Sequence, residues 1–273
     1  MSRLKISAIS YLNTAPLMWD FEHGEAGADF DISYTIPSAC AEGLRAGTAD
    51  IGIIPAAAYT TVPDLVILPD VAIAARRAVR SILLVSKRPV DAGWTQARTV
   101  ALDTSSMTSV ALAKILFAKW LGGKREYEAM APDLDTMLGA CDAALLIGDP
   151  ALQVDRSRYF TLDLAEEWVA RTGKSFVFAF WAMRKQALAG RDGASIAEVF
   201  RKSRDHGLSP KHLGAIAQEW APRLGLTVEA IRVYLTQNIH YYLDPSCLEG
   251  LALYYRLGVE VGALPQVPEL HFV

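Results

Sequence analysis

Short apolar runs alternate with amphipathic segments along the first part of the chain. The apolar runs have the length and β-branched content of strands, and they occupy residues 4–10, 31–36 and 49–55. The segments between them, 14–24 and 37–47, have helical spacing and end at glycines, and Thr14 is predicted to cap the first. The order strand, helix, strand, helix, strand predicts a parallel sheet covered by helices.

A second group with the same pattern lies further along the chain. Its strands and helix are predicted at 97–103, 104–123 and 141–152, followed by a long apolar strand at 174–185. From about residue 190 onward the spacing of apolar residues is helical. The helical segments are predicted at 193–206, 210–224, 227–243 and 246–257.

Extended runs near 80–86 and 176–183 flank the second group. This order predicts an α/β fold of two lobes, each a mostly parallel sheet flanked by helices, joined by two crossing strands. Lobe 1 is predicted to comprise residues 1–86 and 177–273, and lobe 2 is an insertion at 87–176. A ligand is then expected in the cleft between the lobes, at the carboxyl ends of the parallel strands.

Composition narrows the range of partners. The chain has 273 residues, which at about 150 residues per domain indicates two domains. Hydrophobic residues make up 52% of the chain, charged residues 21%, and the net charge is −3. Because no concentrated basic face is present, neither a nucleic acid nor a membrane is expected as a partner. No secretory signal is recognisable, and the apolar runs are shorter than the roughly 20 residues of a membrane-spanning helix, so a cytoplasmic protein is expected.

The sequence lacks the common motifs for metals, cofactors and nucleophiles. Cys40, Cys141 and Cys247 are far apart, and the five histidines have no HExxH spacing, so no metal is expected. There is no GxSxG, P-loop or GxGxxG motif, which leaves serine-hydrolase, P-loop and Rossmann functions without support. No cofactor is expected.

Junctions between strands and helices are rich in serine and threonine. Residues 104–109 hold five hydroxyl side chains in six positions. A helix start with added hydroxyls can hold a carboxylate or phosphate without Lys or Arg. One cap needs only one side chain, so we predict ligand binding here, whereas the junctions at 10–14 and 37–38 also fit ordinary caps. The candidate binding residues of the three junctions are Ser10, Tyr11, Thr14, Ser38, Thr104, Ser105, Ser106 and Thr108.

Three further positions have two interpretations each. Gly148 and Asp149 directly follow a buried strand, and they fit either an ordinary turn or the rim of the cleft. Ser81, at the start of an extended run, fits either a structural or a site residue. Pattern alone therefore predicts a two-lobed protein that binds a small anion, either as a binding or sensor protein or as an enzyme. The missing signal sequence favours the enzyme.

Six sequence blocks occur in the order found in one enzyme family. They are ISYLNTAPL (9–17), PSACAEGLRAGTADIGIIPAAAY (37–59), RSILLVSK (80–87), LDTSSMTSVALAKIL (102–116), LLIGDPAL (145–152) and FVFAFWA (176–182). Through these blocks the chain resembles the chorismate dehydratases of the futalosine route of menaquinone biosynthesis, which have a periplasmic-binding-protein-like type II fold. The block that contains Asn13 favours this family over the sister 1,4-dihydroxy-6-naphthoate synthase, which shares the fold.

The resemblance implies a hydro-lyase that converts chorismate to 3-[(1-carboxyvinyl)oxy]benzoate and water. Near the site blocks only Asp149 and Asp103 could act as a general base, and both are also explained structurally. We therefore hypothesise that the enolpyruvyl carboxylate of the substrate removes the proton. Asn13 and Ser81, the residues to which the resemblance points, would orient this carboxylate and the leaving hydroxyl.

The expected partner is thus one small dianionic substrate, chorismate, and the expected assembly is a monomer or weak homodimer. Two alternatives remain at this stage. The chain could be a non-catalytic binding or sensor protein for a small carboxylate, or it could be the sister naphthoate synthase.

Overall fold

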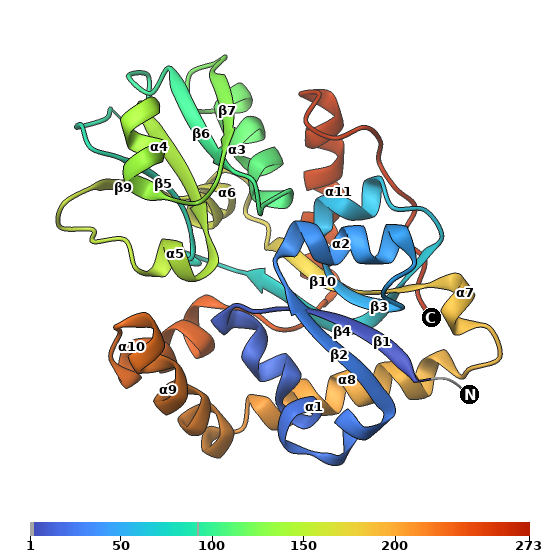
Figure 1. Cartoon of the computed structure of the whole chain (residues 1–273). Helices are drawn as coiled ribbons and strands as arrows, with labels where there is room; N and C mark the ends of the chain where they lie inside the picture. Colours follow the sequence, from blue (N-terminus) through green and yellow to red (C-terminus); the bar gives the residue numbers. More distant parts are fainter. Residues whose placement is uncertain (1–2, 92) are drawn as a thin grey trace.

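The computed structural model describes residues 3–91 and 93–273, which form two five-stranded sheets (Figure 1). The first sheet has the order β2-β1-β3-β10-β4 and the second β7-β6-β8-β5-β9. In the first sheet the strands are β1 (Leu4–Ile9), β2 (Phe30–Thr35), β3 (Ile51–Pro55), β4 (Leu65–Ala75) and β10 (Phe176–Arg184). In the second they are β5 (Ile82–Ser86), β6 (Thr99–Asp103), β7 (Glu126–Met130), β8 (Ala143–Ile147) and β9 (Phe160–Asp163).

The two sheets share one arrangement. β10 is antiparallel to both of its neighbours, β3 and β4, and β5 is antiparallel to both β8 and β9. The pairings of β1 and of β6 are parallel. Each sheet therefore has one reversed strand among strands of a common direction, which confirms the predicted mostly parallel sheets.

Helices cover both sheets and connect their strands. Those up to residue 119 are η1 (Leu12–Met18), α1 (Trp19–His23), η2 (Glu25–Asp29), α2 (Pro37–Ala46), η3 (Ala56–Thr60) and α3 (Thr108–Lys119). In the middle of the chain follow α4 (Leu134–Ala140), α5 (Gly148–Leu152), α6 (Leu164–Thr172) and α7 (Lys185–Leu188). The C-terminal part contains α8 (Gly193–Gly207), α9 (Pro210–Leu224), α10 (Val228–Val233), η4 (Tyr234–Asn238) and α11 (Pro245–Glu260).

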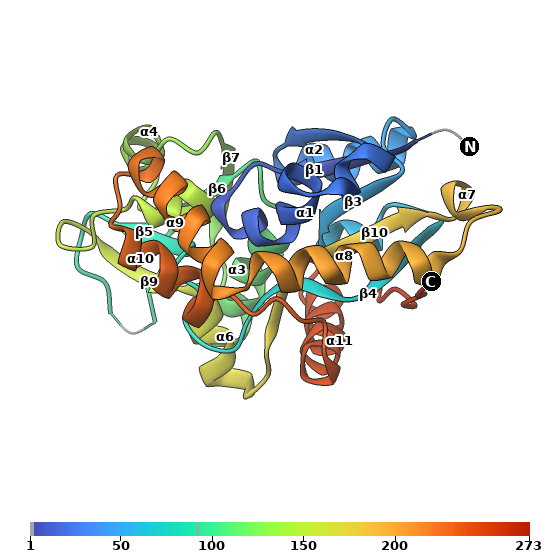
Figure 2. The ribbon, with the colours of Figure 1, turned by 90° about the horizontal axis from the view of Figure 1, so that it is seen from below.

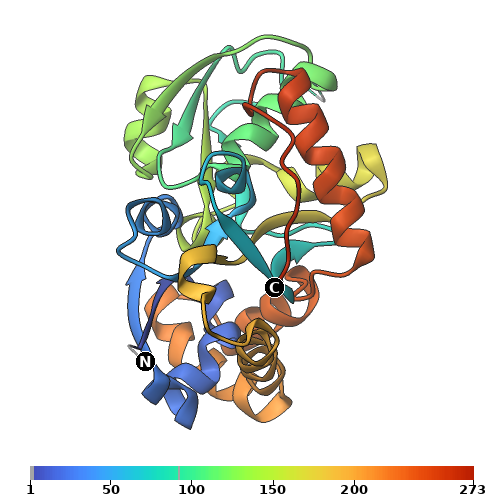
Figure 3. The same ribbon diagram turned by 90° about the vertical axis from the view of Figure 1, so that its right-hand side faces the viewer.

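The C-terminal helices pack against both lobes. In Figure 2, α8 runs along the first sheet, where it contacts η1, α1 and β4. In Figure 3, α11 lies beside the junction of the lobes and contacts both α3 and β10. The chain crosses between the sheets at 76–81, after β4, and at 173–175, before β10. At the second crossing the buried Trp168 ring packs edge-on against Phe176 and Tyr254, so the lobes share a core there.

The position of β5 differs from the predicted lobe assignment. Residues 82–86 were assigned to lobe 1, whereas β5 pairs with β8 and β9 of the second sheet. All five residues of β5 are buried, and a short run of apolar residues fits the interior of either sheet, so its sequence does not indicate which one. The sheet pairing thus places β5 on the other side of the predicted boundary at 86/87, and the boundary at 176/177 stays a prediction.

Several predicted helices begin or end elsewhere. Thr14 is not an N-cap, because it lies inside η1, whose cap position is Tyr11. The helix predicted at 104–123 begins at Thr108, and the segment predicted at 227–243 leaves helical geometry after Asn238. Beyond it, His240 pairs with Ala74 as an isolated bridge. No helix within residues 3–91 and 93–273 is long and apolar enough to cross a membrane.

Candidate functional site

A cavity of about 510 Å³ lies between the lobes, at the carboxyl ends of β1, β3, β6 and β8. Six of the predicted site residues line it: Tyr11, Asn13, Ser81, Ser106, Thr108 and Gly148. The rest of the lining is Ile9, Pro37, Pro55, Ile73, Val79, Ile82, Met107, Ser109, Ile147, Phe178 and Ala179. The apolar members were not predicted, because apolar residues at strand ends look like ordinary core.

The other six predicted site residues lie outside this lining: Ser10, Thr14, Ser38, Thr104, Ser105 and Asp149. Several of them hold the walls in place instead. The Ser38 N–H donates to the Ser105 carbonyl (3.2 Å) across the cleft, and the Thr14 hydroxyl donates to Asn13 Oδ1 (3.4 Å). Direct contact between these six residues and a ligand stays a prediction.

Asp103 shapes the hydroxyl-rich junction before α3. Its carboxylate is completely buried, and Oδ1 accepts hydrogen bonds from Ser105 N–H (2.8 Å) and Ser105 Oγ (2.6 Å). Oδ2 accepts from Ile147 N–H at 3.3 Å, which ties the end of β6 to the end of β8. Burial raises the pKa of the Asp103 carboxyl although these hydrogen bonds oppose the shift. Asp103 thus holds the loop and does not face the cavity.

The residues at the start of α3 present hydroxyl groups to the cavity. Ser106 Oγ accepts from Ser109 N–H (3.2 Å), so its own proton is available to a ligand. Thr108 Oγ1 is already engaged, because it donates to the Phe178 carbonyl (3.0 Å) and accepts from Ala57 N–H (3.1 Å). With the partial positive charge of a 12-residue helix behind it, this turn can hold a carboxylate.

Tyr11 and the start of α5 build another part of the cavity wall. Gly148 has φ +62°, and a Cβ there would lie 2.6 Å from two ring carbons of Tyr11. Next to it, Asp149 Oδ1 accepts from Leu12 N–H at 3.0 Å, a contact between the two lobes. Burial raises the pKa of the Asp149 carboxyl to about 6, and the Leu12 hydrogen bond offsets part of this shift.

Ser81 is fixed by its backbone neighbours. Arg80 has φ +65°, a conformation that costs a non-glycine residue free energy. The Arg80 N–H donates to Asp163 Oδ2 (2.6 Å), and the Arg80 carbonyl accepts from the Arg156 guanidinium (3.1 Å). The Ser81 carbonyl accepts from Gly148 N–H at 2.8 Å. These contacts hold the Ser81 side chain at the cavity wall with 1% exposure.

The charge of the cavity wall is distinctive. Among the described residues, the lining contains no Asp, Glu, His, Lys or Arg. Its one titratable group is the Tyr11 hydroxyl, whose pKa burial raises. The lining therefore offers neutral hydroxyl, amide and backbone donors to an anion, and it contains no carboxylate or imidazole. The nearest carboxylate in sequence is that of Asp149, which follows the lining residue Gly148 and is engaged by Leu12 N–H.

A family model described as menaquinone biosynthesis matches residues 4–260. The chain belongs to this family. A curated relative from Thermus thermophilus, named chorismate dehydratase, is 29% identical over an alignment of 276 positions, which covers 94% of this chain and 94% of the relative. The predicted membership in a menaquinone-biosynthesis family is therefore confirmed.

Solved structures confirm the predicted fold class. Protein AF1704 from Archaeoglobus fulgidus matches with a TM-score of 0.73 at 15% identity, covering 96% of this chain and 98% of that one. The Candida albicans CA3427 product, described as having the periplasmic binding protein fold, matches with a TM-score of 0.71 at 12% identity. The match covers 98% of this chain and 92% of that one. The Escherichia coli aliphatic sulphonate binding protein SsuA matches with a TM-score of 0.67 at 17% identity, covering 98% of this chain and 95% of that one. At these identities the likeness concerns the fold alone.

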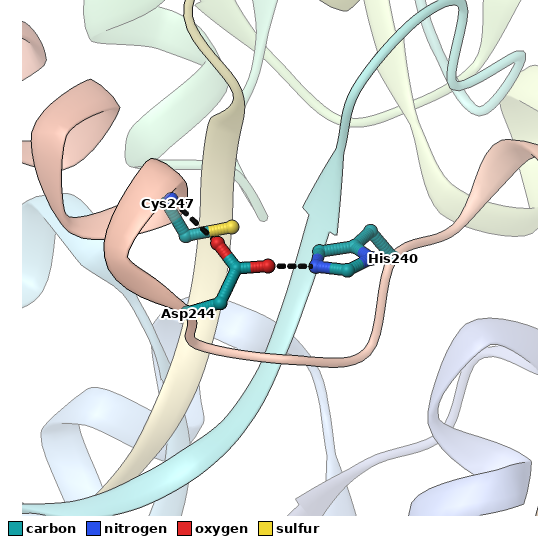
Figure 4. A group of neighbouring side chains, drawn as sticks. All are labelled: His240, Asp244 and Cys247. Carbon is teal, nitrogen blue, oxygen red and sulfur yellow. Dashed lines mark hydrogen bonds and ion pairs between the residues drawn. The ribbon is translucent and has the colours of Figure 1, made fainter.

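Outside the cavity of this family member, three potential metal ligands lie together. The donor atoms of His240, Asp244 and Cys247 are within 4.8 Å of one another (Figure 4). The Asp244 carboxylate, however, already accepts from Cys247 N–H (2.9 Å) and contacts both His240 Nε2 (2.7 Å) and the Arg76 guanidinium. Burial raises the pKa of Asp244, but these contacts outweigh it and lower the pKa to about 2. The positive charge of the Arg76 guanidinium disfavours a bound cation there. The contacts of Asp244 with Arg76, His240 and Cys247 instead hold the start of α11 in place.

Proposed function

We propose that this chain is a chorismate dehydratase, which eliminates water from chorismate to give 3-[(1-carboxyvinyl)oxy]benzoate. One observation carries the proposal within the menaquinone-biosynthesis family: the described cavity lining has neutral donors and no general base. A dianionic substrate that brings its own base fits such a site. The name of the Thermus relative supports the same reaction.

We assign the substrate's ring carboxylate to the start of α3. The hydroxyl of Ser106 and the N–H groups of the helix start would bind it there. Loss of the C3 proton sends negative charge through the neighbouring double bond into this carboxylate. Donors already directed at it stabilise that charge more in the transition state than in the ground state.

The proton of C3 goes to the substrate's enolpyruvyl carboxylate, which is attached to the same carbon through the ether oxygen. The electron pair of the C3–H bond then forms the C3–C4 double bond as the hydroxyl leaves C4. Proton and hydroxide together make the released water, and the ring becomes aromatic. Asn13 orients the enolpyruvyl carboxylate, and Ser81 donates to the leaving hydroxyl, since both line the cavity.

The proposal includes the setting of the enzyme. We place it in the futalosine route, in the cytoplasm, as a monomer or weak homodimer that needs no cofactor, nucleic acid or membrane. Support for this setting comes from the family match and from the cavity between the lobes, which suits one small ligand.

Incubation of the purified protein with chorismate tests the function. Appearance of the aromatic enol ether, followed by ultraviolet absorbance and mass spectrometry, is the expected result. Binding of chorismate without product would instead indicate a sensor protein. Turnover of a cyclic futalosine derivative, with chorismate left intact, would indicate the sister naphthoate synthase.

Asp149 provides a test of the missing base. We expect Asp149→Asn to keep kcat/KM within about tenfold of the wild type, because its carboxylate holds Leu12 N–H and lies outside the cavity lining. A loss of about 10⁴-fold with an intact fold would make Asp149 the base and contradict the proposal. Asp155→Asn, which removes an exposed carboxylate, controls for the change in net charge.

The same variant has an expected stability profile. The folded-state pKa of Asp149 is about 6, above its ordinary value of 3.8, so folding favours the protonated form. Ionisation therefore destabilises the wild type as pH rises from about 4 to above 6, by on the order of 2–3 kcal/mol. Asp149→Asn should remove this loss, and urea unfolding at pH 4 and pH 8 measures it. An equal stability difference at both pH values would contradict the assignment.

A further inference from the structure

Tyr234 is joined to a cavity residue that lies far away in sequence. Its side chain is in η4 and only 2% exposed, and its hydroxyl donates to Ser81 Oγ at 2.9 Å. The side chain of Asn13, another cavity residue, also hydrogen-bonds with this hydroxyl. Tyr234 itself is not part of the cavity lining. Burial raises the pKa of the Tyr234 hydroxyl, so it remains a protonated donor at neutral pH.

The C-terminal segment 234–244 holds this hydroxyl in place along the first crossing. Asn238 Nδ2 donates to the Ala78 carbonyl (2.9 Å). His240 and Ala74 exchange two backbone hydrogen bonds of 2.8 and 2.9 Å. At the C-terminal end of this segment, Asp244 forms an ion pair with Arg76 (Figure 4 shows Asp244). Because η4 is a π-type turn, a geometry that recurs at functional sites, the placement of Tyr234 is not the default of a regular helix.

This contact fixes the direction in which Ser81 can donate. A hydroxyl has one proton and two acceptor lone pairs. Since Ser81 Oγ accepts the Tyr234 proton, the Ser81 proton is left to point away from Tyr234. Ser81 lines the cavity, so a ligand there is the acceptor that this proton can reach.

We propose that Tyr234 is a positioning residue, which orients the Ser81 hydroxyl as a hydrogen-bond donor into the cavity. Its kinetic consequence rests on the proposed function, because Ser81 is there assigned to the leaving hydroxyl of chorismate. Tyr234 lies outside the cavity lining, so it acts through Ser81, with a second contact to Asn13.

A double-mutant cycle tests this role. Tyr234→Phe should lower kcat for chorismate about tenfold, the equivalent of one hydrogen bond, and leave KM within twofold. In the Ser81→Ala background the same change should have a clearly smaller effect, because the hydroxyl that it orients is gone and only the contact of Tyr234 with Asn13 is left to lose. An equal loss of kcat in both backgrounds would show a merely structural role and overturn the proposal, as would unchanged kcat in Tyr234→Phe.

Tyr59→Phe is the matched control. Its hydroxyl is also buried and also donates, to the Leu65 carbonyl (3.3 Å), but it lies outside the cavity lining. It should lose a similar amount of thermal stability and keep its kcat. Crystal structures of the wild type and Tyr234→Phe add a readout that needs no turnover. Ser81 Oγ should occupy one rotamer in the wild type and a shifted or divided set in the variant; one unchanged rotamer would overturn the proposal even if chorismate is not the substrate.

Discussion

Asn13→Asp is expected to lower kcat/KM for chorismate by about 10³-fold and to leave the fold intact. Asn13 lines a cavity whose described wall has no charged side chain. Two like charges about 4 Å apart interact by about 4 kcal/mol at an effective dielectric constant of 20. Because 1.36 kcal/mol corresponds to a factor of ten in rate, a new carboxylate facing a dianion would cost about three orders of magnitude.

Asn13→Ala separates the lost donor from the added charge. It removes the amide without adding a carboxylate, so its loss should be smaller than that of Asn13→Asp at pH 8. Protonation of the new aspartate should restore part of the activity of Asn13→Asp as pH falls, whereas the alanine variant should show no such recovery. Initial rates between pH 5 and pH 8, with circular dichroism to verify folding, distinguish the effect of the lost amide from that of the added charge. Equal losses in the two variants at pH 8 would remove the electrostatic argument.

The position of the site, at the carboxyl ends of strands, was predictable from the sequence. β1 and β6 lie in different sheets, yet both end at the cleft, so Asn13 and Ser106 come together in space. This follows from topology: strands of one direction place their carboxyl ends at one edge, and two such edges face each other across the lobes. The order of apolar runs was therefore enough to predict the cleft and part of its wall.

Side-chain direction was beyond sequence reasoning. Ser105 and Ser106 are adjacent and chemically alike, but Ser105 bonds Asp103 inside the loop while Ser106 faces the cavity. Tyr234 was missed because its acceptor, Ser81, is 153 residues away and the surrounding segment has ordinary helical spacing. A pattern of apolar positions does not reveal a long-range contact between two hydroxyl groups.

Parts of the second lobe also escaped prediction. The strands β7 and β9 are largely exposed or half-buried, so they lack the continuous apolar run that marks a buried strand. The adjoining helices α4 and α6 are short, with 7 and 9 residues, which gives little periodicity to detect. These elements lie away from the cavity lining, so the prediction of the site did not depend on them.

Gly148→Ala is expected to lower kcat/KM by at least about 10²-fold, through the shape of the cavity. The new methyl group would lie 2.6 Å from Tyr11 Cδ2 and Cε2, closer than real carbon contacts, so the ring or the start of α5 must move. Either shift changes the wall beside Asn13 and loosens the bond from Gly148 N–H to the Ser81 carbonyl. Steady-state kinetics with chorismate measure the loss.

Gly173→Ala isolates the backbone part of this effect. Gly173 has φ +66°, close to the +62° of Gly148, but nothing lies within 4 Å of a Cβ added there. The strain of alanine at positive φ should cost each variant about 1–2 kcal/mol of unfolding free energy, and Gly148→Ala should lose more because of its contact with Tyr11. If the Tyr11 contact is what matters for activity, Gly173→Ala keeps its kcat/KM and Gly148→Ala does not. Equal kinetic losses in the two variants would instead assign the effect to general destabilisation and separate Gly148 from the shape of the cavity.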